Sequence, residues 1–291
     1  MRLGGGMSVA FDLHEPDDLD RFVEKYDMYG LSTVVAPWGY DAKSEEFAYR
    51  FGERAKQWGL QIGEAHSRPN LMIQDADERN RRIKQLNEGI RKAKIMGAVC
   101  CCIMAGSAAP EDNLAAPHPF NYTKEAKILL RDALLRAIDG IDMDDIWLVI
   151  EPWPNTFFYQ PDAICEFLDF VEHPKVGLHM DLMNMIDIYH YYNTTELINK
   201  SFDLLGHRIG AVHLKDISWD WKYFTFMKLD EVPVGDGVID YETFIRRIAG
   251  LGWDVPCFCE HATSESIFAQ NFARLHRQAA KLGVSFKPRG V

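Results

Sequence analysis

The sequence lacks an apolar stretch long enough to cross a membrane. No run of about 18 or more apolar residues occurs anywhere along the chain. The opening segment, residues 1–6, is rich in glycine and too short to be a secretory signal peptide. These absences lead us to expect no membrane partner and a cytoplasmic protein.

Positive charge is also scarce. Lysine and arginine together number 32 against 43 aspartates and glutamates, so the formal net charge is -11. A protein that binds a phosphate backbone needs a basic face. We therefore expect no nucleic-acid partner.

Cysteine is infrequent, and the six cysteines lie in or beside apolar runs. Cys100, Cys101 and Cys102 are consecutive. Because consecutive side chains of a strand point to opposite faces, these three cannot all bind one metal. We interpret the cysteines as small buried apolar side chains in a reduced compartment. Metal binding by Cys257 and Cys259, or a redox role, is the alternative.

Strand patterns and helix patterns alternate along nearly the whole sequence. Apolar runs bounded by glycine, proline or charged residues predict strands at 31–36, 61–65, 99–104, 146–151, 176–181, 208–216 and 255–260. Apolar residues at helical spacing predict helices at 17–29, 44–58, 75–96, 123–138, 162–171, 195–205, 240–251 and 265–282. Short connections between alternating strands and helices indicate parallel pairing of the strands.

A first strand in the glycine-rich N-terminal segment would make eight strand–helix units. Eight units favour an α/β fold, a closed (β/α)8 TIM barrel, with residues 1–291 as a single domain. An open doubly wound sheet is the alternative. It is less favoured because the first glycine-rich turn lacks the spaced glycines of a dinucleotide-binding loop.

Three carboxylates and one histidine stand at the ends of the last four predicted strands: Glu151, Asp181, His213 and Glu260. In a barrel, the carboxyl ends of all strands meet at one mouth, where active sites lie. Carboxylate oxygens with one imidazole suit Mn²⁺, Co²⁺, Mg²⁺ or Zn²⁺. The joint pattern therefore predicts a divalent-metal site, although each residue alone would be read as a helix cap, a surface ion pair or a core histidine.

Further polar residues lie near the same strand ends. His66 could transfer protons, and His179 shares a strand face with Asp181, so it could support the site or line the pocket. Lys215 could neutralise an oxyanion or pair with a carboxylate. Asp216 is read as a structural cap.

Aromatic residues near the predicted mouth are candidates for walls on which a sugar ring stacks: Trp38, Trp153, Trp219, Trp221 and Tyr223. Core packing is the alternative for each of them. Asp240 is read as the cap of the helix that follows it rather than as a ligand.

Several motifs occur in a characteristic order: Ile150–Pro152, His179–Asp181, Val212–Asp216, Pro233–Asp240 and Cys259–Glu260. Together they resemble the xylose isomerase-like TIM-barrel superfamily of sugar-phosphate isomerases and epimerases. The resemblance covers nearly the whole chain and is more specific for the superfamily and its metal than for a substrate. It implies that Glu151, Asp181, His213 and Glu260 are the metal ligands, with Mn²⁺ as the metal expected first.

The sequence departs from this pattern in two places. Several members of the superfamily carry a histidine three residues after the aspartate, where this chain has Asn184. Ketose 3-epimerases carry a second glutamate shortly after the first, and residues 155–160 supply none. Because of these two departures and the aromatic insert at 219–226, the chain most resembles, within the superfamily, the inosose dehydratases and the catalytic subunits of C-glycoside deglycosidases.

The resemblance implies a metal-dependent isomerase or epimerase that removes a proton next to a carbonyl of a small carbohydrate or glycoside. The metal would act as a Lewis acid and stabilise an enediolate. The candidates for proton transfer or charge stabilisation are Glu151, Glu260, His66, His179 and Lys215. A homo-oligomer or a small partner subunit is compatible with the sequence.

Three other functions stay open at this point. A lyase of the same superfamily would share the first proton transfer and then eliminate a β-substituent. A sugar-binding barrel without catalysis is a second alternative. A zinc AP endonuclease has the same barrel but is disfavoured, because it needs more histidines at the site and a basic DNA-binding face.

Overall fold

The computed structural model describes residues 1–6, 11–222 and 228–290. Within them, eight parallel strands form one sheet in the order β1-β10-β7-β6-β5-β4-β3-β2. Their bounds are β1 Arg2–Gly5, β2 Thr33–Val35, β3 Gln61–His66, β4 Cys100–Met104, β5 Trp147–Glu151, β6 Val176–Asp181, β7 Ile209–His213 and β10 Pro256–Cys259. The strands predicted from the sequence therefore exist, with ends that differ by a few residues.

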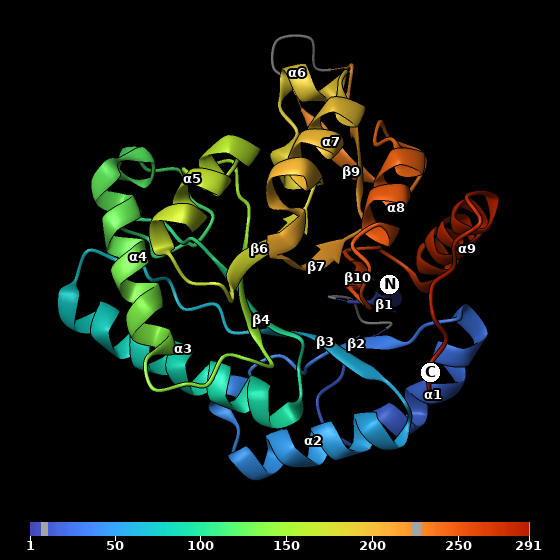
Figure 1. Cartoon of the computed structure of the whole chain (residues 1–291), viewed down its shortest axis with the longest axis horizontal. Coiled ribbons are helices and arrows are strands. Elements are labelled where there is room, and N and C mark those ends of the chain that lie inside the picture. The colour runs from blue at the N-terminus through green and yellow to red at the C-terminus, as the bar shows by residue number, and fades with distance from the viewer. Residues whose placement is uncertain (7–10, 223–227, 291) are drawn as a thin grey trace.

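The sheet curls into a nearly closed barrel. Its two edge strands, β1 and β2, meet through a hydrogen bond of 2.9 Å from the backbone N–H of Ser32 to the carbonyl of Leu3. Figure 1 shows the helices arranged around the outside of the strands. This architecture confirms the TIM-barrel prediction and overturns the open doubly wound alternative.

Each of the eight predicted helices is present in the described ranges, and the short helix α6 is an addition that the sequence did not predict. They are α1 Asp18–Tyr29, α2 Glu45–Gln57, α3 Ala76–Met96, α4 Lys124–Ile138, α5 Pro161–Val171, α6 Ile188–Tyr191, α7 Thr194–Leu205, α8 Tyr241–Ala249 and α9 Glu265–Lys281. Side-chain caps begin several of them: Ser44 accepts a hydrogen bond from Phe47 N–H, and Asp240 accepts one from Thr243 N–H. None of the helices in the described ranges has both the length and the apolar character needed to span a membrane.

One part of the prediction is wrong in detail. The expected strand 208–216 ends at His213, and Asp216 instead begins a separate antiparallel hairpin made of β8 (Asp216–Trp219) and β9 (Leu229–Val232). The chain turns out of the barrel at this point because the carboxylate of Asp216 binds backbone N–H groups of a following loop. The hairpin therefore projects from the same end of the barrel as the predicted site.

The interior of the barrel has its own small apolar cluster of Cys100, Cys102, Val149 and Ala211, against which Trp147 packs. Gly177 and Gly210 make room for the ring of Trp147, since a β-carbon at either position would lie within 3.3 Å of Trp147 side-chain atoms.

Cys101 faces the opposite way from its two neighbours and lies 3.5 Å from the hydroxyl of Tyr40. Cys165 is partly exposed, the other cysteines are buried, and all six are free thiols. This agrees with their interpretation as small apolar side chains.

Candidate metal centre

The four predicted ligands lie at the carboxyl ends of adjacent strands. Glu151 ends β5, Asp181 ends β6, His213 ends β7, and Glu260 directly follows β10. The register of the sheet pairs Asp181 with His213 and Phe258 with His213, so the strand ends are level with one another. Each of the four side chains is buried.

The side chains converge on one nitrogen. Nδ1 of His213 lies 3.1 Å from Glu260 Oε2, 3.3 Å from Asp181 Oδ2 and 3.7 Å from Glu151 Oε1. The structure therefore brings together residues that are more than a hundred positions apart in the sequence. Three oxygens around one imidazole nitrogen are a donor set that a divalent cation binds.

Two cations and one amide hold these carboxylates in place. Lys215 Nζ lies 2.8 Å from Asp181 Oδ2 and 3.0 Å from Glu260 Oε2. Arg68 Nη2 donates to Glu151 Oε2 at 2.8 Å. The amide of Asn184 donates to Asp181 Oδ2 at 3.0 Å and to Glu151 Oε1 at 3.2 Å. Asn184, which occupies the position of the absent histidine, thus ties two of the predicted ligands together.

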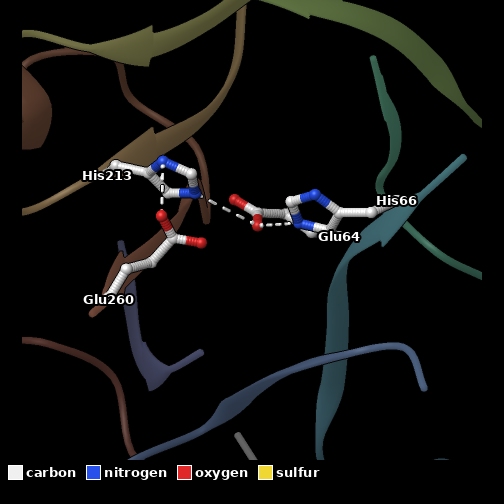
Figure 2. Close-up of side chains that lie close together, drawn as sticks. All are labelled: Glu64, His66, His213 and Glu260. Carbon is white, nitrogen blue, oxygen red and sulfur yellow. Dashed lines mark hydrogen bonds and ion pairs between the residues drawn. The ribbon is translucent and has the colours of Figure 1, made fainter. Parts of the chain in front are cut away.

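A further buried carboxylate, Glu64 of β3, is absent from the sequence-based prediction. Its Oε1 lies 2.6 Å from His179 Nε2, and its Oε2 lies 3.0 Å from His66 Nε2 and 3.5 Å from His213 Nε2. Figure 2 shows the Glu64 carboxylate between the rings of His66 and His213, with Glu260 next to His213. The sequence did contain a signal for Glu64. Side chains alternate between the two faces of a strand, so Glu64 must point to the same face as the candidate residue His66.

The electrostatics of the centre keep its groups ionised. Burial by itself would raise the pKa of the Glu151 carboxyl, but His213 and Arg68 hold that pKa well below its ordinary value. Burial also opposes ionisation of Glu64, yet the neighbouring His179 and His213 lower the pKa of its carboxyl. Burial would lower the pKa of Lys215, whereas Asp181 and Glu260 raise it well above its usual range. Lys215 is therefore a permanent cation here.

The side chains of the site carry an excess of negative charge that a divalent ion would balance. Four carboxylates and two cations gather in the described part of the mouth: Glu64, Glu151, Asp181, Glu260, Arg68 and Lys215. Burial would lower the pKa of His213, but Glu260 and Glu64 raise it well above its ordinary value, so His213 carries a proton that it would give up on binding a metal. With His213 neutral, the four carboxylates exceed Arg68 and Lys215 by two negative charges, which a divalent cation would neutralise. Glu260 Oε1 is buried and makes no hydrogen bond to any described residue. The residues present therefore fit a divalent metal.

A comparison with protein families agrees with this architecture. The model of the xylose isomerase-like TIM barrel family matches residues 10–281. The chain belongs to this family. A search of curated proteins found no match.

Solved structures of similar fold include other barrels of this kind. A xylose isomerase-like TIM barrel protein from Mycobacterium smegmatis in complex with magnesium is 19% identical, with 94% of this chain and 93% of that chain covered and a TM-score of 0.66. A probable 3-DHS dehydratase from Bacillus anthracis is 15% identical, with 94% and 98% covered and a TM-score of 0.71. The 3-keto-D-glucoside 4-epimerase of E. coli is 14% identical, with 95% and 99% covered and a TM-score of 0.68. At these identities, the likeness concerns the fold.

In this xylose isomerase-like barrel, Trp38 lies beside the candidate metal centre. The ring centroid of Trp38 is 5.5 Å from that of His66, and the guanidinium of Arg68 lies 5.8 Å from the Trp38 ring centroid. Trp38 is 46% exposed, whereas His66 is buried beneath it. Trp38 therefore forms an accessible wall next to the predicted site.

The other aromatic candidates have different surroundings. Trp153 Nε1 donates to the carbonyl of Ala115 at 3.2 Å, which indicates a structural role for its polar end. Trp219 packs edge to face on Tyr191, with 6.0 Å between ring centroids. Trp221 is 79% exposed, and Tyr223 lies outside the described residues.

Asp216 has the structural role expected of it, but it organises a loop rather than a helix end. Its carboxylate accepts hydrogen bonds from the backbone N–H groups of Gly235, Gly237 and Ile239, at 2.8, 3.1 and 3.1 Å. A β-carbon at Gly237 would lie 2.2 Å from Asp216 Oδ1, so only glycine fits there. The interaction explains the spacing of the Gly-x-Gly-x-Ile-Asp motif and fixes the segment that follows Lys215.

Proposed function

We propose that this protein is a divalent-metal-dependent enzyme that isomerises or epimerises a small carbohydrate by removing a proton next to a carbonyl. The observation that carries the proposal is the convergence of Glu151, Asp181 and Glu260 on Nδ1 of His213 at the mouth of the barrel. The family supports it, and so does the fold it shares with a 3-keto-D-glucoside 4-epimerase and a D-psicose 3-epimerase.

In this proposal, Glu151, Asp181, His213 and Glu260 hold the metal. When bound, the metal supplies Lewis-acid polarisation of the substrate carbonyl and makes the adjacent C–H more acidic. Mn²⁺ is the first candidate, because the donors are mainly hard oxygens with one imidazole; Mg²⁺, Co²⁺ and Zn²⁺ suit the same set.

The remaining residues have roles set by their charge. Lys215 and Arg68 keep the carboxylates ionised and present positive charge to the oxyanion that develops on the substrate. A side chain with a free lone pair removes the proton from the carbon next to the carbonyl. The reaction is completed when a proton returns to a neighbouring carbon, or to the other face of the same carbon. Trp38 provides an apolar surface for the sugar ring.

Elimination is the second candidate, and a specific observation favours it. In the loop after β5, where ketose epimerases have a second glutamate, the amide of Asn155 donates to the Ala115 carbonyl and the hydroxyl of Thr156 donates to the Trp153 carbonyl. These side chains hold the loop together, so this loop supplies no second acid or base. A site with fewer proton-transfer groups than that of the ketose epimerases favours a lyase over an epimerase. A probable dehydratase also shares the fold.

Metal content is the first test. Purified wild type is expected to contain or take up one divalent ion per chain, and Glu260→Gln and His213→Ala are expected to lose it. Exposed Glu242→Gln and His207→Ala are matched controls that keep the metal. Absence of metal uptake by the wild type would exclude the proposed metal centre.

The reaction is tested with the metal-loaded wild type in deuterium oxide. Incorporation of deuterium next to the carbonyl of a keto-sugar supports proton abstraction. A rearranged sugar then identifies an isomerase or epimerase, and an unsaturated product identifies a lyase. Sugar binding without any exchange would instead favour the non-catalytic barrel.

A further inference from the structure

The two carboxylate oxygens of Glu64 contact different imidazole rings at the centre of the barrel. The side chain has no exposed surface, and each of its oxygens faces a ring nitrogen, Oε1 at 2.6 Å from His179 Nε2 and Oε2 at 3.0 Å from His66 Nε2. An ionised carboxylate only accepts hydrogen bonds. With Glu64 ionised in the metal-free protein, both facing nitrogens carry a hydrogen.

This contact determines where the lone pair of His66 lies. In a neutral imidazole with hydrogen on Nε2, the other nitrogen, Nδ1, is an acceptor. Nδ1 of His66 is buried and has no hydrogen-bond partner among the described residues, and Figure 2 shows this nitrogen turned away from Glu64. A buried acceptor without a partner is costly in a folded protein, which suggests that a ligand group meets it.

The ring of His66 lies between the accessible wall of the candidate site and the ring of His213. Its ring packs against Trp38, the partly exposed aromatic wall, and lies parallel to the ring of His213 with 6.5 Å between centroids. The ring of His179 also has an unpaired Nδ1, but this residue has no exposed surface and lies deeper, against His213 at 3.9 Å between centroids. Of the two imidazoles, His66 is thus the one that lies next to the accessible wall formed by Trp38.

We propose that His66 is the proton-transfer residue of this enzyme and that Glu64 is the residue that positions it. This inference rests on the proposed function and names the base of that reaction. The other candidates have competing roles: Lys215 is a cation held by two carboxylates. Glu151 and Glu260 are paired with Arg68 and Lys215, and in the proposed function both hold the metal, which would also take the unpartnered Glu260 Oε1.

The proton transfer balances as follows. Nδ1 takes the proton from the carbon next to the carbonyl, the electrons of the C–H bond form a carbon–carbon double bond, and the carbonyl π electrons move to oxygen. The new imidazolium is stabilised by its Nε2–H bond to Glu64. Return of the proton to the other face of the same carbon, with the oxyanion electrons re-forming the carbonyl, completes an epimerisation. Delivery of the proton to the former carbonyl carbon, with the proton of the neighbouring hydroxyl passing to the oxyanion, completes an isomerisation. Departure of a β-substituent with its bonding electrons, as the oxyanion re-forms the carbonyl, completes an elimination.

The first experiment needs no substrate. Nitrogen-15 NMR of histidine-labelled, metal-free protein is expected to show His66 with hydrogen on Nε2 and a bare Nδ1, with the signal assigned by its loss in His66→Gln. In Glu64→Gln, the amide can present either an oxygen or an N–H₂ group, so we expect a mixture of tautomers. Hydrogen on Nδ1 in the wild type, or an unchanged tautomer in Glu64→Gln, would overturn the positioning role.

The second experiment measures exchange of the substrate C–H for deuterium with saturating Mn²⁺. His66→Gln is expected to lose roughly 10²–10⁴-fold in exchange rate while keeping the Mn²⁺ affinity of the wild type. Glu64→Gln is expected to lower kcat more than it changes KM, and exposed His207→Gln is the control.

The outcomes separate the two proposals. If the wild type exchanges and His66→Gln exchanges equally fast, the assignment of the base is wrong and the proposed function stands. If the wild type exchanges no C–H with any keto-sugar, the function fails and the role of His66 fails with it.

Discussion

The ammonium group of Lys215 lies 2.8 Å from Asp181 Oδ2, and both side chains are buried in the mouth of the barrel. The same nitrogen lies 3.0 Å from Glu260 Oε2. Lys215 thus compensates two carboxylates that we propose as metal ligands. Together with His213, it keeps them ionised and close together.

Removing this cation should make the fold depend on metal. Lys215→Met leaves the buried carboxylates of Asp181 and Glu260 with less compensation, and we expect a loss of about 3–5 kcal/mol in the free energy of unfolding of the metal-free protein. Added Mn²⁺ should restore more stability to the variant than to the wild type, because it replaces the lost charge. Urea unfolding with and without Mn²⁺ measures both effects.

Lys200→Met is the matched control, since Lys200 pairs with Asp162 on the surface. It should change stability little under either condition. Equal stabilisation of wild type and Lys215→Met by Mn²⁺ would contradict a shared role of Lys215 and the metal.

The meeting of the four strand-end residues was predictable, and the reason is topological. Parallel strands joined by helices all end at one mouth, so Glu151, Asp181, His213 and Glu260 had to approach one another once eight units were recognised. Apolar runs and caps located the strands; Val176–Asp181, for example, has the predicted bounds. Binding of a metal by these residues stays a prediction.

Other contributors were not predictable because their partners are remote in the sequence. Glu64 is the single acidic residue of β3, and its partner His179 is 115 positions away. Arg68 lies in a loop, where no periodicity indicates direction, yet it binds Glu151. The hairpin after β7 was missed because Asp216 was read as the end of a strand, although its carboxylate binds a loop about twenty residues further on.

The loop held by Asp216 offers a test of stability. Asp216→Ala removes the acceptor of four buried or partly buried backbone N–H groups, and we expect a loss of about 2–4 kcal/mol in the free energy of unfolding. Asp236→Ala in the same loop removes only a partly exposed ion pair with Arg274 and should cost much less. Urea unfolding of both variants makes the comparison. Equal losses would show that the buried hydrogen bonds of Asp216 contribute little.

Asp18, at the start of α1, should make stability depend on pH. Burial raises the pKa of its carboxyl, but backbone hydrogen bonds from Glu15 and His14 lower it more, so the folded-state pKa lies below the ordinary value of 3.8. The ionised carboxylate therefore stabilises the fold above pH about 4, and this contribution is lost as the pH falls through the folded-state pKa.

In Asp18→Asn, the side chain cannot ionise. The stability gap between wild type and variant should be largest near neutral pH and should shrink below pH about 4. Urea unfolding between these values measures the gap, with exposed Asp132→Asn as control. A gap that is constant with pH would contradict the lowered pKa of Asp18.

Trp38 tests whether the wall beside His66 binds the substrate. The side chain is 46% exposed, so Trp38→Ala should change the melting temperature only slightly, while loss of a stacking surface should raise KM roughly tenfold with a smaller effect on kcat. Tyr49→Ala is the control, because Tyr49 is 55% exposed on α2 at the outside of the barrel and should leave KM unchanged. Steady-state kinetics on a sugar that exchanges deuterium gives both constants. An unchanged KM in Trp38→Ala would mean that the ring covers His66 without contacting the substrate, and a large fall in kcat alone would mean that Trp38 acts by holding the ring of His66 in place.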